Sequence, residues 1–178
     1  MEKIEITKAK ITKNQTLEAT YIRHNEDGTT TVVDEKDCEN LVHPDLVAAF
    51  QKLAPHMALI VDLRESDIIG KTGKKTAIDA VPVEHFSKFE VKSFSIGGDG
   101  EGVVISGNKK LNSAQIFNIN TPFQKYEDEL SDYQWGSELA EVVQHCVYEV
   151  EQYLSGKCAA KQTELQFVGG DGGEEVHA

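Results

Sequence analysis

Several residue types are scarce in this chain of 178 residues, and each scarcity excludes a class of protein. There are three cysteines and no Cys-x-x-Cys pair, so we expect neither a disulfide framework nor a zinc ribbon. No apolar run approaches the roughly 20 residues that a membrane span requires. The opening stretch, MEKIEITKAK, lacks the apolar core of a signal peptide. We therefore expect a cytoplasmic protein with free thiols and no membrane segment.

Basic residues are also few relative to acidic ones. Lysine and arginine together number 18 against 30 aspartates and glutamates, which gives a formal net charge of -12. A widely acidic surface repels phosphate backbones, and this argues against tight, sequence-independent binding to duplex DNA. A local basic groove remains compatible with nucleic-acid binding.

The stretch IIGKTGKKTA, residues 68–77, contains a Gly-Lys-Thr triplet but lacks the spacing of a nucleotide-binding P-loop. A P-loop would need a glycine at position 65, where Glu65 stands, and a helix immediately afterwards. Pro82 disfavours that helix. We expect a basic loop that binds no nucleotide and offers a weak nucleic-acid contact through its lysines: Lys71, Lys74 and Lys75.

Apolar residues alternate or recur at helical spacing in the same order in both halves of the chain. In the first half the patterns predict strands over 4–12, 17–24 and 29–33, then a helix that begins at Pro44 and is kinked at Pro55. In the second half they predict strands over 89–96, 103–106 and 115–120, a turn at 109–112, and a helix over 137–154. We therefore predict an α+β fold in which two pseudo-repeated β-β-β-α units form a mainly antiparallel sheet with the helices on one face.

The same patterns set the expected domain organisation. We expect one α+β domain over residues 1–156, built from two halves, 1–66 and 86–156, that a basic loop joins. Residues 157–178 combine glycine and acidic residues with a short apolar island, and this composition predicts a flexible acidic tail.

No motif of catalytic or metal-binding chemistry emerges. The six histidines are scattered, and the nearby pair Cys38 and His43 has no second pair to complete a zinc site. Cys146 lies on the apolar stripe of the last predicted helix, which is typical of a core residue. The glycine-rich run 97–102 fails the dinucleotide-binding spacing and favours a hairpin turn. We expect no enzyme activity, no catalytic residue, no metal and no cofactor.

Aromatic residues are only 7% of the chain, and most of them gather in its second half, where strands are predicted. Aromatics on strands usually fill a core. If some of them lie on an uncovered face of the sheet beside lysines, they would instead form a platform for single-stranded nucleic acid. The aromatics concerned are Phe86, Phe89, Phe94, Phe117, Phe123 and Tyr126, and the lysines are Lys88, Lys92, Lys109 and Lys110. We retain Lys109 and Lys110 as weak nucleic-acid-binding candidates.

The tail contains the sequence Gln162-Thr163-Glu164-Leu165-Gln166-Phe167, which resembles the Gln-x-x-Leu-x-Phe peptides that dock on bacterial sliding clamps. In such peptides the glutamine forms hydrogen bonds at a rim, while the leucine and phenylalanine fill an apolar pocket. The partner-binding candidates are therefore Gln162, Leu165 and Phe167. The alternative is that Leu165 and Phe167 fold back onto the domain.

Five segments together resemble an uncharacterised family of small acidic proteins carried by phages and prophages of gut bacteria. The segments are IEITKAKI, LVHPDLVAAF, FEVKSFSIGG, NTPFQKYEDE and VYEVEQYL. The resemblance spans nearly the whole chain and supplies no catalytic residues. It implies a non-enzymatic phage accessory protein that binds a protein partner in DNA replication, recombination or host-defence machinery. The alternatives are a single-stranded nucleic-acid-binding protein and an inhibitor of a host defence nuclease, similar to an anti-CRISPR protein.

Overall fold

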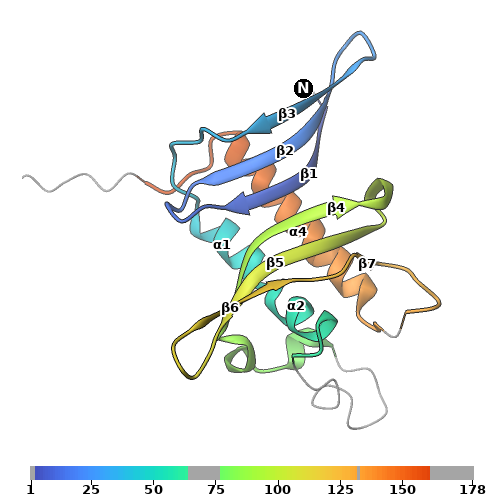
Figure 1. The fold of residues 1–178 in the computed structure, drawn as a ribbon. Coiled ribbons are helices and arrows are strands. Elements are labelled where there is room, and N and C mark those ends of the chain that lie inside the picture. The colour runs from blue at the N-terminus through green and yellow to red at the C-terminus, as the bar shows by residue number, and fades with distance from the viewer. Residues whose placement is uncertain (1–2, 64–76, 132, 161–178) are drawn as a thin grey trace, which may run out of the picture.

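A computed structural model describes residues 3–63, 77–131 and 133–160 of the chain. Its centre is an antiparallel sheet with the strand order β3-β2-β1-β4-β5-β6, and β7 pairs with β5 (Figure 1). The strands are β1 (Lys3–Ile11), β2 (Leu17–His24), β3 (Thr30–Glu35), β4 (Phe89–Gly97), β5 (Gly102–Lys110), β6 (Ile116–Asn120) and β7 (Gln124–Lys125). The predicted α+β class with a mainly antiparallel sheet is confirmed.

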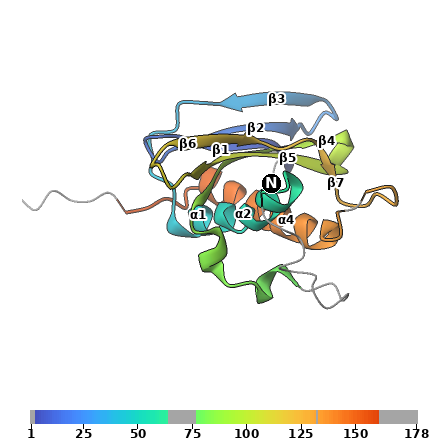
Figure 2. The ribbon, with the colours of Figure 1, turned by 60° about the horizontal axis from the view of Figure 1, so that its bottom comes forward.

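Three α-helices accompany the sheet, and Figure 2 shows them together below it in that view. They are α1 (Pro44–Gln51), α2 (Ala54–Ile60) and α4 (Gly136–Leu154). Three short 3-10 helices lie in the connections: η1 (Ile78–Ala80), η2 (Val83–Phe86) and η3 (Gly98–Gly100). No helix among the described residues is long and apolar enough to cross a membrane.

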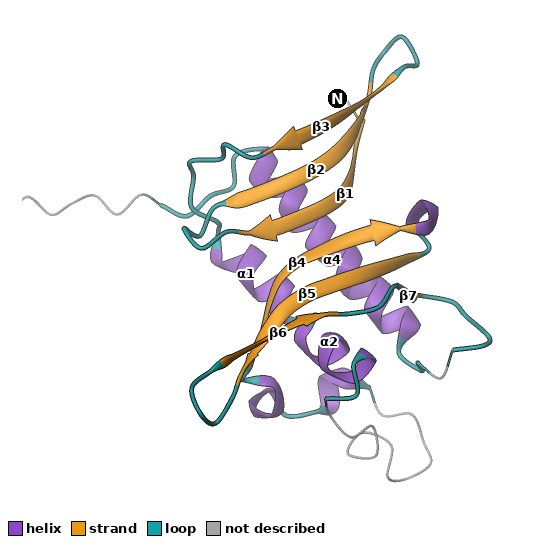
Figure 3. Cartoon of the chain, in the orientation of Figure 1, coloured by secondary structure: helices purple, strands orange, loops and turns teal. Residues whose placement is uncertain are grey.

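Local sequence explains where the first two helices begin. His43 caps α1 by accepting a hydrogen bond from the Asp45 amide at its Nδ1 atom (3.2 Å), and Pro44 occupies the first helical position. Pro55 lies in the first turn of α2, so the chain forms two short helices instead of one long one. Figure 3 shows that α1 and α2 follow each other closely.

The core lies between the sheet and the helices. Strand β2 contributes Leu17, Ala19 and Tyr21, which alternate along the strand and are all buried. The rings of Phe50 on α1 and Phe94 on β4 meet edge to face with centroids 5.4 Å apart. Helix α4 adds an apolar stripe of Leu139, Val143, Cys146, Val150 and Tyr153. Cys146 is fully buried in this core.

The two halves of the chain meet along a short seam, and the helices of each half pack on a strand of the other half. Strands β1 and β4 pair only at Lys8–Ser95, Ala9–Phe94 and Lys10–Ser93. Helices α1 and α2, from the first half, pack on β4 of the second half. Helix α4, from the second half, packs on β1 of the first half and on α1.

The end of the described chain is attached to the domain. The Lys157 ammonium group lies 2.7 Å from the Asp45 carboxylate and 2.9 Å from the buried carboxylate of Glu149. The Ala159 amide donates a hydrogen bond to the Leu41 carbonyl (3.0 Å). The packed chain therefore continues past residue 156, which was the expected domain boundary.

Candidate functional site

Positive charge is concentrated at the end of the sheet where β4 begins and β5 ends. Lys88 immediately precedes β4, and antiparallel pairing places it beside the last residue of β5, since the Lys110 amide donates a hydrogen bond to the Lys88 carbonyl (2.9 Å). A pocket of about 480 Å³ opens here. We call it the basic pocket, and its cationic or titratable basic residues are His85, Lys88, Lys109 and Lys110.

One carboxylate, that of Glu84, also lines the basic pocket, but none of its three lysines forms an ion pair with a described residue. The Lys109 ammonium group lies 5.1 Å from the centroid of the Phe89 ring, and Lys88 donates a hydrogen bond to the Asn112 side chain. Within residues 3–63, 77–131 and 133–160, none of the three forms an ion pair, whereas several other lysines do: Lys10, Lys36, Lys92, Lys125 and Lys157. An anion entering this pocket would therefore meet available positive charge.

The strand register places an exposed aromatic ring beside these lysines. Lys109 pairs with Phe89 on β4 and with Phe117 on β6, so the three residues form one row across the sheet. Phe89 is buried, while Phe117 is 47% exposed. An exposed ring next to a lysine is the combination that base stacking and phosphate contact require.

The structure corrects one expectation about this region. Lys109 and Lys110 belong to strand β5, not to a turn, because β5 pairs with β4 on one side and with β6 on the other as far as Lys110. The turn follows at Leu111, whose amide bonds to the Gln115 carbonyl.

Three of the predicted aromatic residues are part of the core, as expected, and this limits the alternative of an aromatic platform. Phe86, Phe89 and Phe94 are buried and cannot stack on a ligand. Lys92, one of the lysines proposed to accompany them, forms an ion pair with Glu90 at 2.5 Å. Its charge is therefore neutralised by a neighbouring carboxylate. Phe117 is the aromatic residue that remains available beside the basic pocket.

The other sequence candidates lie outside the described residues. These are Lys71, Lys74 and Lys75 in the basic loop, and Gln162, Leu165 and Phe167 in the tail. His85 was not a candidate from the sequence. It lies close to Lys88 in the chain, and the fold places both of them at one pocket with Lys109 and Lys110.

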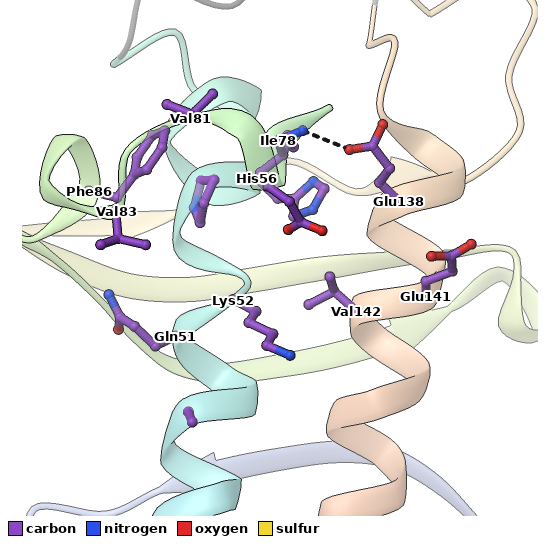
Figure 4. Close-up of a pocket in the computed structure, with 13 residues that line it drawn as sticks. Gln51, Lys52, His56, Ile78, Val81, Val83, Phe86, Glu138, Glu141 and Val142 are labelled. Atoms are coloured by element: carbon purple, nitrogen blue, oxygen red, sulfur yellow. Dashed lines mark hydrogen bonds between the residues drawn. The ribbon is translucent and has the colours of Figure 1, made fainter. Parts of the chain in front are cut away.

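A second hollow, the helix pocket, lies between the helices and the segment that carries η1 and η2 (Figure 4). It has a volume of about 430 Å³. Figure 4 shows Lys52 and His56 on the α1–α2 side, Glu138 and Glu141 on α4, and Val81 and Phe86 on the segment opposite. The Ile78 amide donates a hydrogen bond to Glu138 Oε2 (3.0 Å), which ties this segment to α4.

His56 is the most deeply buried polar residue at the helix pocket, with 1% of its surface exposed. Its Nδ1 atom and the Tyr133 hydroxyl share a hydrogen bond of 2.5 Å. Burial lowers the pKa of His56 to about 3 and raises the pKa of Tyr133 well above its usual value. At neutral pH both side chains are therefore uncharged, so His56 offers a ligand a hydrogen bond and no charge.

Neither pocket resembles a built metal site. No group of three histidine, cysteine or carboxylate side chains placed to hold a metal ion occurs in the part of the chain that the structure describes. The fully buried thiol of Cys146 has its pKa raised to about 12, chiefly by burial, and donates to the Ala49 carbonyl (3.2 Å). Such a thiol is unreactive at neutral pH.

Comparison with known proteins adds no family assignment. Protein-family models, curated proteins and solved structures gave no match to this chain.

Proposed function

We propose that this chain is a cytoplasmic, non-catalytic accessory protein that acts by binding, and that the basic pocket holds a single strand of nucleic acid. The observation that supports this proposal is the row of Phe117 and Lys109 beside Lys88 and Lys110. Three lysines line the pocket against the one carboxylate of Glu84, and none of the three forms an ion pair among the described residues. Phe117 would stack on a base, while the ammonium groups would contact phosphates. Single strands fit better than duplexes, because stacking needs an unpaired base.

The size of the site limits the strength of this interaction. Stacking on one aromatic ring contributes about 1–3 kcal/mol, and each phosphate contact on a single strand adds about 0.7 to the slope of log affinity against log salt concentration. The net charge of -12 acts against every contact. We therefore expect weak, strongly salt-dependent binding to a short strand.

Reversing the charge at two lysines tests this proposal. Lys109→Glu with Lys110→Glu should weaken binding to a fluorescent oligothymidylate by roughly tenfold or more and should lower the salt slope by about 1.4, because two phosphate contacts are lost. Fluorescence anisotropy at several salt concentrations measures both. Phe117→Ala should weaken binding at every salt concentration without changing the slope.

The matched control makes the same charge change elsewhere. Lys10→Glu with Lys36→Glu alters two exposed lysines of the other half, which pair with Glu18 and Asp34. If this control weakens binding as much as the pocket variant, the affinity depends on net charge alone and the basic pocket is not the binding site. Absence of binding by the unaltered chain at low salt would contradict the proposal outright.

The second candidate function is docking on a protein partner through Gln162, Leu165 and Phe167, with a sliding clamp as the leading partner. The anchoring of the preceding residues supports it, since Lys157 and Ala159 fix the point from which the tail continues, beside the start of α1.

A host nuclease is the alternative partner. An inhibitor of that kind would present acidic residues to a basic groove, and Asp34, Asp37 and Glu39 are exposed on and after β3.

Leu165→Ala with Phe167→Ala should abolish capture of a purified bacterial sliding clamp and leave the melting temperature of the domain nearly unchanged. The reason is that both apolar side chains would be buried in the partner and not in the domain. Surface-plasmon resonance on the immobilised clamp and thermal denaturation measure the two quantities. Glu164→Ala with Gln166→Ala, in the same segment, should retain capture. A large fall in melting temperature in the first variant would mean that the two side chains fold back onto the domain.

We also propose that the two halves are pseudo-repeats whose helices share one face of the sheet. The first half gives β1, β2 and β3 and then α1 and α2, and the second half gives β4, β5, β6 and the two-residue β7 and then α4. The first three strands of the two halves lie in mirrored order on either side of the β1–β4 seam. A superposition of residues 4–61 on 89–154 that failed to bring β1 onto β4 would contradict the repeat.

A further inference from the structure

The helix pocket plays no part in the proposed function, and its chemistry differs from that of the basic pocket. We propose that the helix pocket binds a small, mostly apolar molecule that carries one positively charged group, such as an arylalkylamine. This inference is independent of nucleic-acid binding and of the tail.

The volume and walls of the pocket define the body of this ligand. About 430 Å³ lies within the usual range for small-molecule sites. The walls are mainly apolar and come from three separate parts of the chain: Pro55 on α2, Val142 on α4, and Val81, Val83 and Phe86 on the segment opposite. A compact aromatic or branched aliphatic group would remove these surfaces from water.

The charged residues of the pocket define the head group. Among the described residues that line it there are three carboxylates, from Asp79, Glu138 and Glu141, and one ammonium group, from Lys52. Glu138 already accepts a hydrogen bond from the Ile78 amide. Asp79 and Glu141 are exposed at the rim of the pocket. A cation is therefore attracted to the rim, whereas an anion of the same shape is repelled.

The pocket is held in shape before a ligand arrives. The ring of Tyr133 fixes His56 through its hydroxyl and packs edge to face against Trp135 at 5.7 Å. Trp135, Ile78 and Leu59 form a small buried cluster of their own, and Ile78 also belongs to the pocket wall. Binding then requires little reorganisation, which lowers its free-energy cost.

His56 supplies a directional contact at the base of the pocket. Its Nδ1 atom is committed to Tyr133, and its other ring nitrogen has no hydrogen-bond partner among the residues that the structure describes. Because the ring is neutral, it neither repels a cation nor attracts an anion. It can orient a polar atom of the ligand, for example an indole N–H or a ring nitrogen.

A pair of probes that differ only in charge tests the proposal on the full-length chain. Tryptamine and indole-3-acetate share an aromatic body but carry opposite charges at neutral pH. Titration followed by two-dimensional amide NMR should show tryptamine binding with a dissociation constant on the order of 1 mM or tighter, with shifts centred on Val81, Phe86 and Val142. Indole-3-acetate should bind at least tenfold more weakly.

Two variants that fill the pocket locate the site. Val142→Phe should abolish tryptamine binding, and Val47→Phe, on an exposed position of α1 outside the pocket, should leave it unchanged. Val83 is 78% exposed, so Val83→Trp covers the pocket without disturbing the core and serves if Val142→Phe fails to fold. Glu141→Gln should reduce the difference in affinity between tryptamine and indole-3-acetate, because one of the carboxylates at the rim is removed. Equal binding of the two probes, no binding of tryptamine at 10 mM (a roughly tenfold excess over the expected constant), or unchanged binding by Val83→Trp would overturn the proposal.

Discussion

Replacing Gly136 with alanine is expected to lower the free energy of unfolding by about 3 kcal/mol, at the upper end of ordinary overpacking. Gly136 begins α4, and a Cβ atom there would lie 1.9 Å from the Tyr126 carbonyl oxygen. Alanine is the best helix former, so local propensity alone would predict stabilisation. The steric conflict makes the substitution destabilising overall, because the contacting atom belongs to the backbone and cannot move away by a side-chain rotation.

Urea denaturation measures this change, and a melting temperature lower by roughly 10 °C should accompany it in a domain of this size. Ser137→Ala is the matched control, because Ser137 is the next residue of the same helix and is exposed. It should change stability by less than about 0.5 kcal/mol. If Gly136→Ala were as stable as this control, the close approach of α4 to Tyr126 would be wrong.

Lowering the pH from 7 to 5 is expected to cost about 2 kcal/mol of stability through His56 alone. In the unfolded chain this histidine has its ordinary pKa of about 6.5, whereas burial lowers the pKa of His56 in the folded protein to about 3. Between these values the unfolded chain binds a proton that the folded protein does not. The contribution of His56 to stability is therefore fully present above the unfolded pKa and is lost progressively as the pH falls toward the folded value.

Urea denaturation of the unaltered chain and of His56→Gln, each at pH 7 and pH 5, isolates this contribution. The difference in unfolding free energy between the two pH values should be smaller by about 2 kcal/mol in His56→Gln, because glutamine does not titrate. Tyr133→Phe is the control, since it removes the hydrogen bond to His56 but leaves the histidine buried, and it should keep the pH dependence. Equal pH dependence in the unaltered chain and in His56→Gln would mean that His56 is not buried as a neutral ring.

Those parts of the fold that depend on local patterns were predictable from the sequence. The alternation in β2 and the helical spacing in α4 each describe one buried face, and Pro44 marks the start of α1. The end of β5 was not predictable, because Gly107 and Asn108 have low strand propensity. Pairing with strands on both sides overrides that propensity and extends β5 to Lys110.

The candidate sites depend on contacts between residues far apart in the sequence, which patterns do not report. The row of Phe89, Lys109 and Phe117 requires the register of three strands, and a shift of one residue in either pairing would turn Lys109 away from one of the rings. His56 reads in the sequence as one scattered histidine. Its environment is set by Tyr133, which follows it by 77 positions.

The exchange of helices across the β1–β4 seam has a consequence for how the domain comes apart. The apolar stripe of α4 covers β1, and α1 and α2 cover β4. The helices of each half therefore keep water from the strands of the other half. Neither half retains a closed core if the other melts, even though only three residue pairs join β1 to β4. Unfolding is therefore expected to be cooperative, and fragments cut between α2 and β4 would each be unstructured alone and would regain structure by complementing one another.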